Sequence, residues 1–541
     1  MWDDARTIGG DLGTLFVLLG GLMAGSTLVA AVWREWYAIP GFLLSAALTA
    51  GLGAVLNRWG TDSPDTDPAH GLVTAALAWL FSGVLCGLPI LFVAWTVALD
   101  PSRFATPELD RTLVVFLSPT NAAFEGMSGV TGTGLTMALD ESVLPATIQW
   151  WRSLVQWIGG VGVVVLAAAV VLTGESGAFR ELYEEKAAVE TIGESTEETL
   201  RAIWWVFVAL TAGSVLALWA AGMPAWQAIN HGMTGISTGG FTVTPDGIAS
   251  YDDPVIEAVL LPVMALGAIS FAVHYYALRG DVHALYADRQ TRWLLGILGA
   301  GVLLVGLFLF AGPFVSPGDA VRFGAFQFVS ALTCTGFQTD TALGTVWSLE
   351  AQLLLVGAMT VGGASGSTAG GIKVIRFMSL TKGSYYRMTE AFFPDVQRTP
   401  QIAEAEGEAT VDHSSSEFDQ AAAVGLLWIF LLLFGVICLL LVLDLPLEVV
   451  LFEVASAQGN VGLSAGPTGP TMPDAAKGIL MTNMWIGRLE IIPVAALARA
   501  LLKGFGADLD EVDVDEDDVG EAEGGEDEDG TEDADAGDGG D

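Results

Sequence analysis

Residues 124–136 read FEGMSGVTGTGLT, and the same pattern returns in three later stretches. These are residues 230–242 (NHGMTGISTGGFT), 326–338 (FQFVSALTCTGFQ) and 452–464 (FEVASAQGNVGLS). Aligned without gaps, all four share one glycine, which follows a hydroxyl side chain by six places. The shared glycines are Gly134, Gly240, Gly336 and Gly462. They are spaced by 106, 96 and 126 residues, so the chain predicts four copies of one structural unit.

Long apolar runs lie on both sides of each repeated stretch. A transmembrane helix needs about 20 mostly apolar residues, and ten runs meet this need. They are residues 12–33, 36–57, 71–99, 153–174, 202–223, 258–278, 293–312, 351–372, 420–443 and 478–502. The sequence therefore predicts an all-α polytopic membrane protein. Four tandem helix–pore loop–helix repeats would form a pseudo-fourfold arrangement, with two extra N-terminal transmembrane helices.

Composition excludes several other classes of protein. Of 541 residues, 52% are hydrophobic and only 16% are charged, whereas soluble domains carry about 25% charged residues. The net charge of −40 excludes a nucleic-acid binder, because nothing here would neutralise phosphates. Three distant cysteines (Cys86, Cys334 and Cys438) provide neither zinc-ligand spacing nor a disulfide framework. We expect no enzyme activity and no cofactor in this chain.

The domain boundaries follow from the spans. We expect an N-terminal extension at residues 8–58, four pore repeats and an acidic tail at residues 508–541, which holds 19 acids and no base and is predicted to be disordered. The repeats are residues 71–175, 200–280, 290–382 and 417–504. With the N-terminus inside, fourteen Lys and Arg fall on inner segments and six on outer ones. Because basic residues favour the cytoplasmic side, both termini are predicted to be cytoplasmic.

The repeated stretches predict a cation filter. Non-helical backbone at membrane depth survives only where it lines water or is buried in protein. Rings of backbone carbonyls can replace the water shell of K+, and glycine permits the positive φ that turns carbonyls inward. Magnesium or calcium would need carboxylates, which residues 131–134, 237–240, 333–336 and 459–462 lack. The predicted K+ filter residues are Thr131, Gly132, Thr133, Gly134, Ser237, Thr238, Gly239, Gly240, Thr333, Cys334, Thr335, Gly336, Gly459, Asn460, Val461 and Gly462. The alternative for the glycines is close helix packing.

A polar side chain stands nine places before each shared glycine. These side chains are Glu125, His231, Gln327 and Glu453. We expect Glu125 and Glu453 to pair with backbone donors behind the filter, and direct binding of the ion is the alternative. We expect His231 to be a structural hydrogen-bonding residue rather than a proton carrier.

A glycine-rich segment predicts a gate. Residues 361–376 read VGGASGSTAGGIKVIR, with Gly362, Gly363, Gly366, Gly370 and Gly371 close together. Each glycine costs about 1 kcal/mol against alanine in a helix, so the span must break in mid-membrane. The break forms either a movable barrier across the pore or a static kink. Lys373 is expected to anchor its end by pairing with an acid or with carbonyl groups.

Arg488 is a charge inside a predicted span, in residues 485–490 (WIGRLE). A charge there points to function: lining the pore, it would repel cations beneath the filter. The alternative is an ion pair with Glu490 or an acid of another helix.

These features together resemble the Trk/Ktr/HKT superfamily of potassium uptake proteins. Residues 361–376 resemble its broken third-repeat helix, and residues 485–490 resemble its fourth-repeat second helix with an arginine near the pore. The two extra N-terminal spans favour the TrkH branch. The resemblance covers residues 8–504 and implies a homodimeric pore subunit that conducts K+ and Rb+ by a channel-like route. It also implies a cytoplasmic, TrkA-like ring of nucleotide-binding subunits; the loops at 174–201, 279–292 and 382–419 are candidate docking surfaces.

Some alternatives stay open on the sequence. Residues 459–461 (GNV) depart most from the Thr-rich pattern of the first filter stretch, which leaves the K+ to Na+ selectivity open. A Na+- or H+-coupled symporter would also use broken helices, although it predicts inverted repeats. A membrane enzyme or electron-transfer subunit would need clustered histidines, and the five present (His70, His231, His274, His283 and His413) are scattered. The acid excess of the loops suggests a high-salt cytoplasm, where surface charge is screened.

Overall fold

A computed structural model describes residues 2–60, 68–101, 111–173, 196–310, 316–340, 343–392 and 411–503. Every regular element in these ranges is a helix, which confirms the predicted all-α fold class. The long helices are α1 (Trp2–Val32), α2 (Ala38–Trp59), α3 (Pro68–Leu99), α7 (Ala146–Thr173), α9 (Thr196–Ala220), α14 (Arg289–Phe310), α17 (Val374–Phe392) and α18 (Val411–Leu440). The shorter ones are η1 (Val114–Leu117), α6 (Pro119–Val130), η2 (Glu141–Val143), α10 (Ala225–Ile236), η3 (Gly247–Tyr251), α11 (Pro254–Ala268), α12 (Phe271–Leu278), α13 (Ala284–Ala287), α15 (Pro317–Leu332), α16 (Leu349–Val361), α19 (Leu447–Gln458), α20 (Asp474–Arg488) and α21 (Ile492–Lys503).

The chain is a multi-pass membrane protein. Within the described residues, six helices are long and apolar enough to cross a membrane, and the bent pair α11 and α12 brings the number to as many as seven. Large apolar side chains on these helices are exposed, for example Leu28 on α1, Leu303 on α14 and Phe430 on α18. Because lipid is the solvent for this belt, exposure of leucine and phenylalanine there costs nothing.

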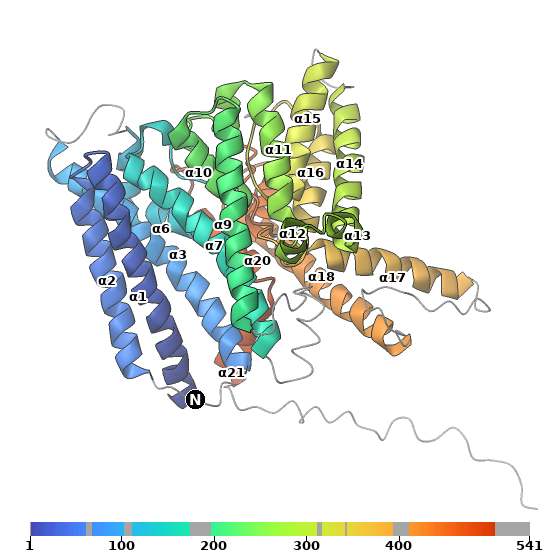
Figure 1. Ribbon diagram of the computed structural model, residues 1–541, viewed down its shortest axis with the longest axis horizontal. Coiled ribbons are helices and arrows are strands. Elements are labelled where there is room, and N and C mark those ends of the chain that lie inside the picture. The colour runs from blue at the N-terminus through green and yellow to red at the C-terminus, as the bar shows by residue number, and fades with distance from the viewer. Residues whose placement is uncertain are drawn as a thin grey trace, which may run out of the picture.

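The N-terminal helices α1 and α2 form an antiparallel pair along one side of the bundle and pack against α3 (Figure 1). Small residues let their backbones approach closely, as is usual where helices meet in a membrane. A Cβ added at Gly53 would stand 2.6 Å from the carbonyl oxygen of Gly13. Glu35, in the turn between the two helices, accepts hydrogen bonds from the backbone amides of Ala146 and Thr147 at 2.7 and 2.9 Å. The pair is thereby tied to the start of α7.

The same order of elements recurs four times after this pair. A first helix is followed by a short buried helix, an extended stretch and a second helix. The short helices α6, α10, α15 and α19 each pack against the first helix of their own unit, which is α3, α9, α14 and α18. The side chain after each shared glycine is buried, as at Phe241 and Phe337. Hydrophobic packing behind the extended stretches therefore fixes their backbones.

Three of the ten predicted spans, within the described residues, are not single straight helices. The break in residues 351–372 was predicted, because α16 ends at Val361 and α17 begins at Val374. Two further breaks were not predicted. The run 258–278 bends by 109° between α11 and α12, and the run 478–502 stops at Arg488 and resumes at Ile492. Residues 258–278 were predicted as one span, and residues 478–502 as a span interrupted by the charges of Arg488, Glu490 and Arg499. The contacts that break both helices are described below.

Two other predictions fall outside the described residues. These are the cytoplasmic helix around residues 179–189 and the acidic tail at residues 508–541.

Candidate ion pathway

Each of the four short helices ends in the same backbone turn. The first residue of each predicted filter stretch has a helical φ, from −73° at Gly459 to −80° at Ser237. The second has a positive φ, at 67°, 49°, 55° and 53° in chain order. The backbone amide of the third then donates to a carbonyl five residues back, as from Thr133 to Ser128 at 2.9 Å. This is the hydrogen bond of a Schellman cap. The repeat seen in the sequence is thus a repeat of backbone geometry.

The four shared glycines close the stretches into a ring. Their φ angles are 91°, 75°, 82° and 99°, in a region that only glycine enters freely. A Cβ added at any of them would overlap a carbonyl oxygen of the neighbouring unit. The overlaps are Gly134 with Gly239, Gly240 with Thr335, Gly336 with Val461, and Gly462 with Thr133. The contacts run from the first unit to the fourth and back to the first, so the four stretches surround one axis.

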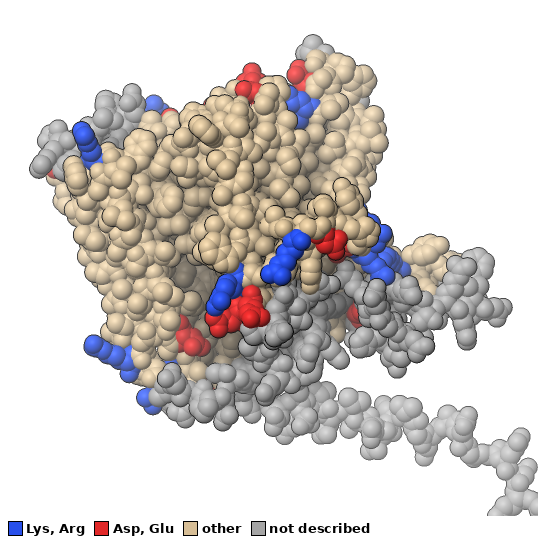
Figure 2. Space-filling model, viewed as in Figure 1, with Lys and Arg blue, Asp and Glu red and all other residues tan. Residues whose placement is uncertain are grey.

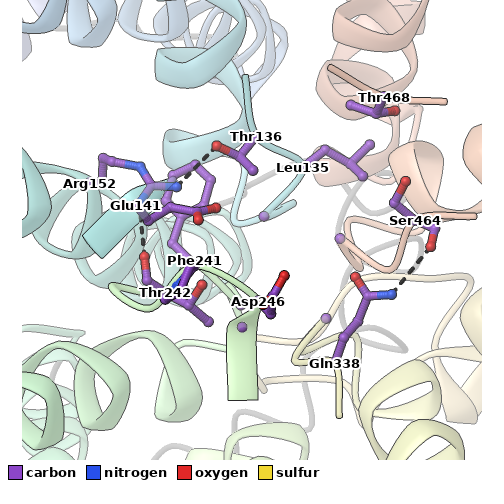
Figure 3. Close-up of a pocket in the computed structure, with 16 residues that line it drawn as sticks. Leu135, Thr136, Glu141, Arg152, Phe241, Thr242, Asp246, Gln338, Ser464 and Thr468 are labelled. Carbon is purple, nitrogen blue, oxygen red and sulfur yellow. Dashed lines mark hydrogen bonds between the residues drawn. The ribbon is translucent and has the colours of Figure 1, made fainter. Parts of the chain in front are cut away.

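One end of the ring opens into a cavity of about 180 Å³ that all four shared glycines line. Figure 3 shows side chains from all four units around it, among them Thr136, Asp246, Gln338 and Ser464. Glu141 also lines this mouth, and burial raises its pKa to about 8 although the Arg152 guanidinium opposes the shift. Burial therefore favours the protonated form of Glu141, whereas Asp246, at the same mouth, is exposed.

The polar residues nine places before the glycines hold the backbone beyond the ring. Glu453 accepts from the amide of Ala465 at 2.7 Å, and Glu125 accepts from the amide of Met137 at 2.8 Å. In the second unit, the amide of Val243 donates to Nε2 of His231 at 3.4 Å. In the third, Nε2 of Gln327 donates to the carbonyl of Asp340 at 3.3 Å. All four lie behind the ring and not in it.

Two side chains that the sequence analysis did not single out, Arg152 and Gln156, tie the first unit to the second. Both lie on α7. Arg152 donates from Nε to Glu125 at 2.7 Å and from Nη1 to the carbonyl of Thr242 at 2.9 Å. Gln156 accepts from the amide of Phe241 at 2.9 Å and donates to the carbonyl of Gly239. An arginine was visible in the sequence, but nothing there identified partners up to 90 residues away.

We expect Arg152→Gln to destabilise the protein strongly. The side chains of Arg152 and Glu125 are 1% and 0% exposed, and breaking a buried ion pair leaves the remaining charge unpaired, at a cost of about 3–5 kcal/mol. Thermal unfolding in detergent measures the loss. The matched control is Arg201→Gln, which removes an exposed pair with Glu197 and should cost about 0–1 kcal/mol. Equal thermal unfolding midpoints for the two variants would count against a role for Arg152 in stabilising the folded protein.

Residues 362–373 cross the other end of the ring. All seven predicted gate residues lie in or against this segment: Gly362, Gly363, Gly366, Gly370, Gly371, Lys373 and Arg488. A Cβ added at Gly370 would overlap the carbonyl oxygen of Gly459, the first residue of the fourth filter stretch. Thr368 donates from Oγ1 to the carbonyl of Ile236, at the end of α10, at 3.1 Å. The segment thus reaches from its own unit to the second and the fourth.

The same segment explains the bend between α11 and α12. The last turn of α11 leaves carbonyls without partners in the helix, and the segment supplies donors to them. The amide of Ala364 donates to Ala268 at 2.8 Å, and Oγ1 of Thr368 donates to Gly267 at 3.0 Å. In return, the amide of Phe271, the first residue of α12, donates to the carbonyl of Gly366 at 3.1 Å.

Arg488 lies between the ring and the segment. Its Nη1 donates to the carbonyl of Thr368 at 2.8 Å, and its Nη2 donates to the carbonyl of Gly159 at 2.9 Å. A Cβ added at Gly132 would stand 3.6 Å from Nη1, so the guanidinium is beside the first filter stretch. Both of these partners are backbone carbonyls, so the geometry differs from the alternative of an ion pair with Glu490.

Glu490 instead pairs with the start of α17. Its carboxylate accepts from Nη2 of Arg376 at 2.8 Å and lies 3.9 Å from Nζ of Lys373. Lys373 also donates to the carbonyl of Ala369, which is the anchoring contact expected of it. Glu490 and Ile491 have positive φ, at 53° and 75°. The break between α20 and α21 therefore turns the Glu490 carboxylate toward the end of the segment.

Comparison with known proteins places this geometry among cation transporters. The family model for TrkH, described as a cation transport protein, matches residues 110–504. An uncharacterized cation transporter of Methanocaldococcus jannaschii is 30% identical over 500 residues, covering 91% of this chain and 96% of the relative. The Trk system potassium uptake protein TrkH of Escherichia coli is 28% identical, covering 91% and 98%. The crystal structure of the potassium transporter TrkH from Vibrio parahaemolyticus superposes with a TM-score of 0.77 at 25% identity, covering 91% and 98%.

Proposed function

Because the chain belongs to the TrkH family of cation transport proteins, we propose that it is the pore subunit of a K+ uptake system. It transports K+ and Rb+ across the cell membrane through the ring of four filter stretches. The observation that carries this proposal is the closure of that ring, in which each shared glycine packs against a carbonyl of the next unit.

The filter works by backbone carbonyls. An ion that enters from the mouth leaves its water shell and is coordinated by the oxygens of the sixteen filter residues. These residues carry no carboxylate, so a monovalent cation suits the ring better than a divalent one. The short helices point their C-terminal ends toward the ring, where the partly negative end of the helix dipole favours a cation.

The gate is the segment 362–373 together with Arg488. Its position across the inner end of the ring blocks ion passage, and the Arg488 charge repels cations there. Lys373 and Arg376 hold the end of the segment through Glu490. Movement of α17, which begins one residue after Lys373, would therefore move the segment. This arrangement favours a movable barrier over a static kink.

The transport is channel-like and driven by the membrane potential. With both termini in the cytoplasm, the mouth faces outward, and a voltage contributes about 2.3 kcal/mol per charge per 100 mV to K+ entry. As the resemblance to the Trk/Ktr/HKT superfamily implies, we propose that the chain acts as a homodimer with a cytoplasmic TrkA-like ring. Its inner segments, including α13 and α17, offer the docking surface for that ring.

Flux in liposomes tests the proposal. Purified protein should carry Rb+ and K+ down their gradients, and Na+ more slowly, without any gradient of Na+ or protons. A requirement for a Na+ or proton gradient would favour the coupled symporter instead. Equal flux of K+, Rb+ and Na+ would contradict the proposal that the ring is a selectivity filter.

A further inference from the structure

Three basic side chains meet where α14 begins and α17 passes it. Arg289 and Arg292 lie in the first turn of α14, and Lys382 lies on α17 with its Nζ 5.9 Å from the ring centre of Trp293. We call these three residues the basic junction. Figure 2 shows basic side chains gathered over this part of the molecule. They stand out because the whole chain has only 22 Lys and Arg against 62 acids.

The charges of the basic junction repel one another. Burial lowers the pKa of Lys382, and the positive charges of Arg289 and Arg292 lower it further. The neighbouring acid, Asp288, is engaged in capping α14, where its carboxylate accepts from the amide of Thr291 at 2.7 Å and from its hydroxyl. An anion beside Arg292 and Lys382 would relieve the repulsion between these two charges.

The basic junction lies at the depth in the membrane where lipid headgroups are found. α14 is long and apolar enough to span a membrane and begins at Arg289, so the junction lies where that span meets water. Trp293, one turn further in, is the kind of side chain that marks the interface. From the same point α17 projects sideways out of the bundle, beyond α14 (Figure 1). Tyr385 and Met388 on this helix are exposed. Basic pockets between membrane helices on the cytoplasmic side are suited to anionic headgroups.

The junction also contacts the gate segment through one buried residue. Gln290 lies between the two arginines and is 1% exposed, and its Oε1 accepts from the amide of Ser365 at 2.9 Å. Trp293 packs edge-on against Phe377, near the start of α17, with ring centres 6.5 Å apart. A ligand that fixes the first turn of α14 would therefore also fix the support of residues 362–373.

We infer that the basic junction binds the phosphate headgroup of an anionic phospholipid in the cytoplasmic leaflet and that this lipid steadies the gate segment. The binding stands apart from the transport function, whereas the effect on flux rests on the function proposed above. The two are tested separately.

The binding test compares Arg292→Gln/Lys382→Gln with the wild type. Each protein is placed in mixed micelles that contain phosphatidylglycerol and in micelles that contain phosphatidylcholine alone. The rise in unfolding temperature caused by phosphatidylglycerol, and the lipid retained in native mass spectrometry, measure the affinity. Each basic residue near an anionic surface contributes about fivefold, so the double variant should bind phosphatidylglycerol about 30-fold more weakly. Arg58→Gln/Arg201→Gln is the matched control, because it removes two exposed charges from other inner segments and should leave the preference intact.

Two results would overturn the lipid site. One is a wild type without preference for phosphatidylglycerol, as expected if an acidic segment of protein fills the junction. The other is a junction variant that retains the wild-type preference. Rb+ flux is then measured in vesicles with and without phosphatidylglycerol. If the wild type binds phosphatidylglycerol but its Rb+ flux is the same in both kinds of vesicle, the proposed effect of the lipid on the gate is wrong. Absence of any flux with binding intact would count against the proposed transport function and leave the lipid site standing.

Discussion

Gly336→Ser should abolish most Rb+ flux. The glycine has a φ of 82°, and a Cβ there would overlap the carbonyl oxygen of Val461 and stand 3.0 Å from the Cα of Gly462. A side chain at this φ is strained by about 1–3 kcal/mol, and the overlap forces a ring carbonyl away from the axis. A loss of about 3 kcal/mol in stabilising the passing ion corresponds to about 100-fold in rate. Tracer uptake into proteoliposomes measures it.

Gly299→Ser is the matched control for this variant. Gly299 lies on α14, and a Cβ added there meets no atom within 4 Å. The control should keep both the wild-type flux and the wild-type unfolding temperature. Gly336→Ser should unfold at a slightly lower temperature, because its strain of about 1–3 kcal/mol lowers the free energy of unfolding. The ratio of Rb+ to Na+ flux in Gly336→Ser should also fall. Undiminished, selective flux in that variant would contradict the assignment of the filter.

Arg488→Ala should raise Rb+ flux. The guanidinium lies beside the first filter stretch, where an ion about 6 Å away would be repelled by about 3 kcal/mol at an effective dielectric constant near 20. The variant also removes the hydrogen bonds that hold Thr368 of the segment and Gly159 of α7 together. Both effects act in the same direction, so we expect flux to increase by about tenfold or more in the same uptake measurement.

Arg488→Lys distinguishes the effect of losing the positive charge from the effect of losing the arginine side chain. Lysine keeps the positive charge beneath the ring, so its flux should stay near that of the wild type. The alanine variant should still fold, because Glu490 is paired with Arg376 and is left with a partner when Arg488 is removed. Unchanged or lower flux in a well-folded Arg488→Ala protein would show that the arginine is only a structural tie.

The two variants act on opposite faces of one small assembly. The shared glycines line the mouth, whereas Gly459 packs against the segment and Gly132 lies beside Arg488. Gly370 of the segment packs against Gly459, which is itself the cap of α19. A change in the segment is therefore transmitted to the ring through backbone contacts, and lipid at the basic junction would act on the same segment from its far side through Gln290.

The sequence by itself determined the features that depend on local backbone chemistry. Four ungapped copies of one pattern predicted the four units, and the positive φ of the shared glycines is what that pattern requires. The cluster of glycines at residues 362–371 predicted the break after α16, because a helix cannot hold so many of them at about 1 kcal/mol each. Hydropathy alone predicted the membrane-spanning helices.

Only the tertiary structure decided the two unpredicted breaks and the ties behind the ring. Ile269 and Ser270 have no helix-breaking chemistry, and α11 ends there because the segment supplies donors to the freed carbonyls of Gly267 and Ala268. Glu490 and Ile491 likewise adopt positive φ where the Glu490 carboxylate pairs with Arg376, 114 residues away. Such contacts leave no pattern along the chain, because each is a single pair of residues that folding alone brings together.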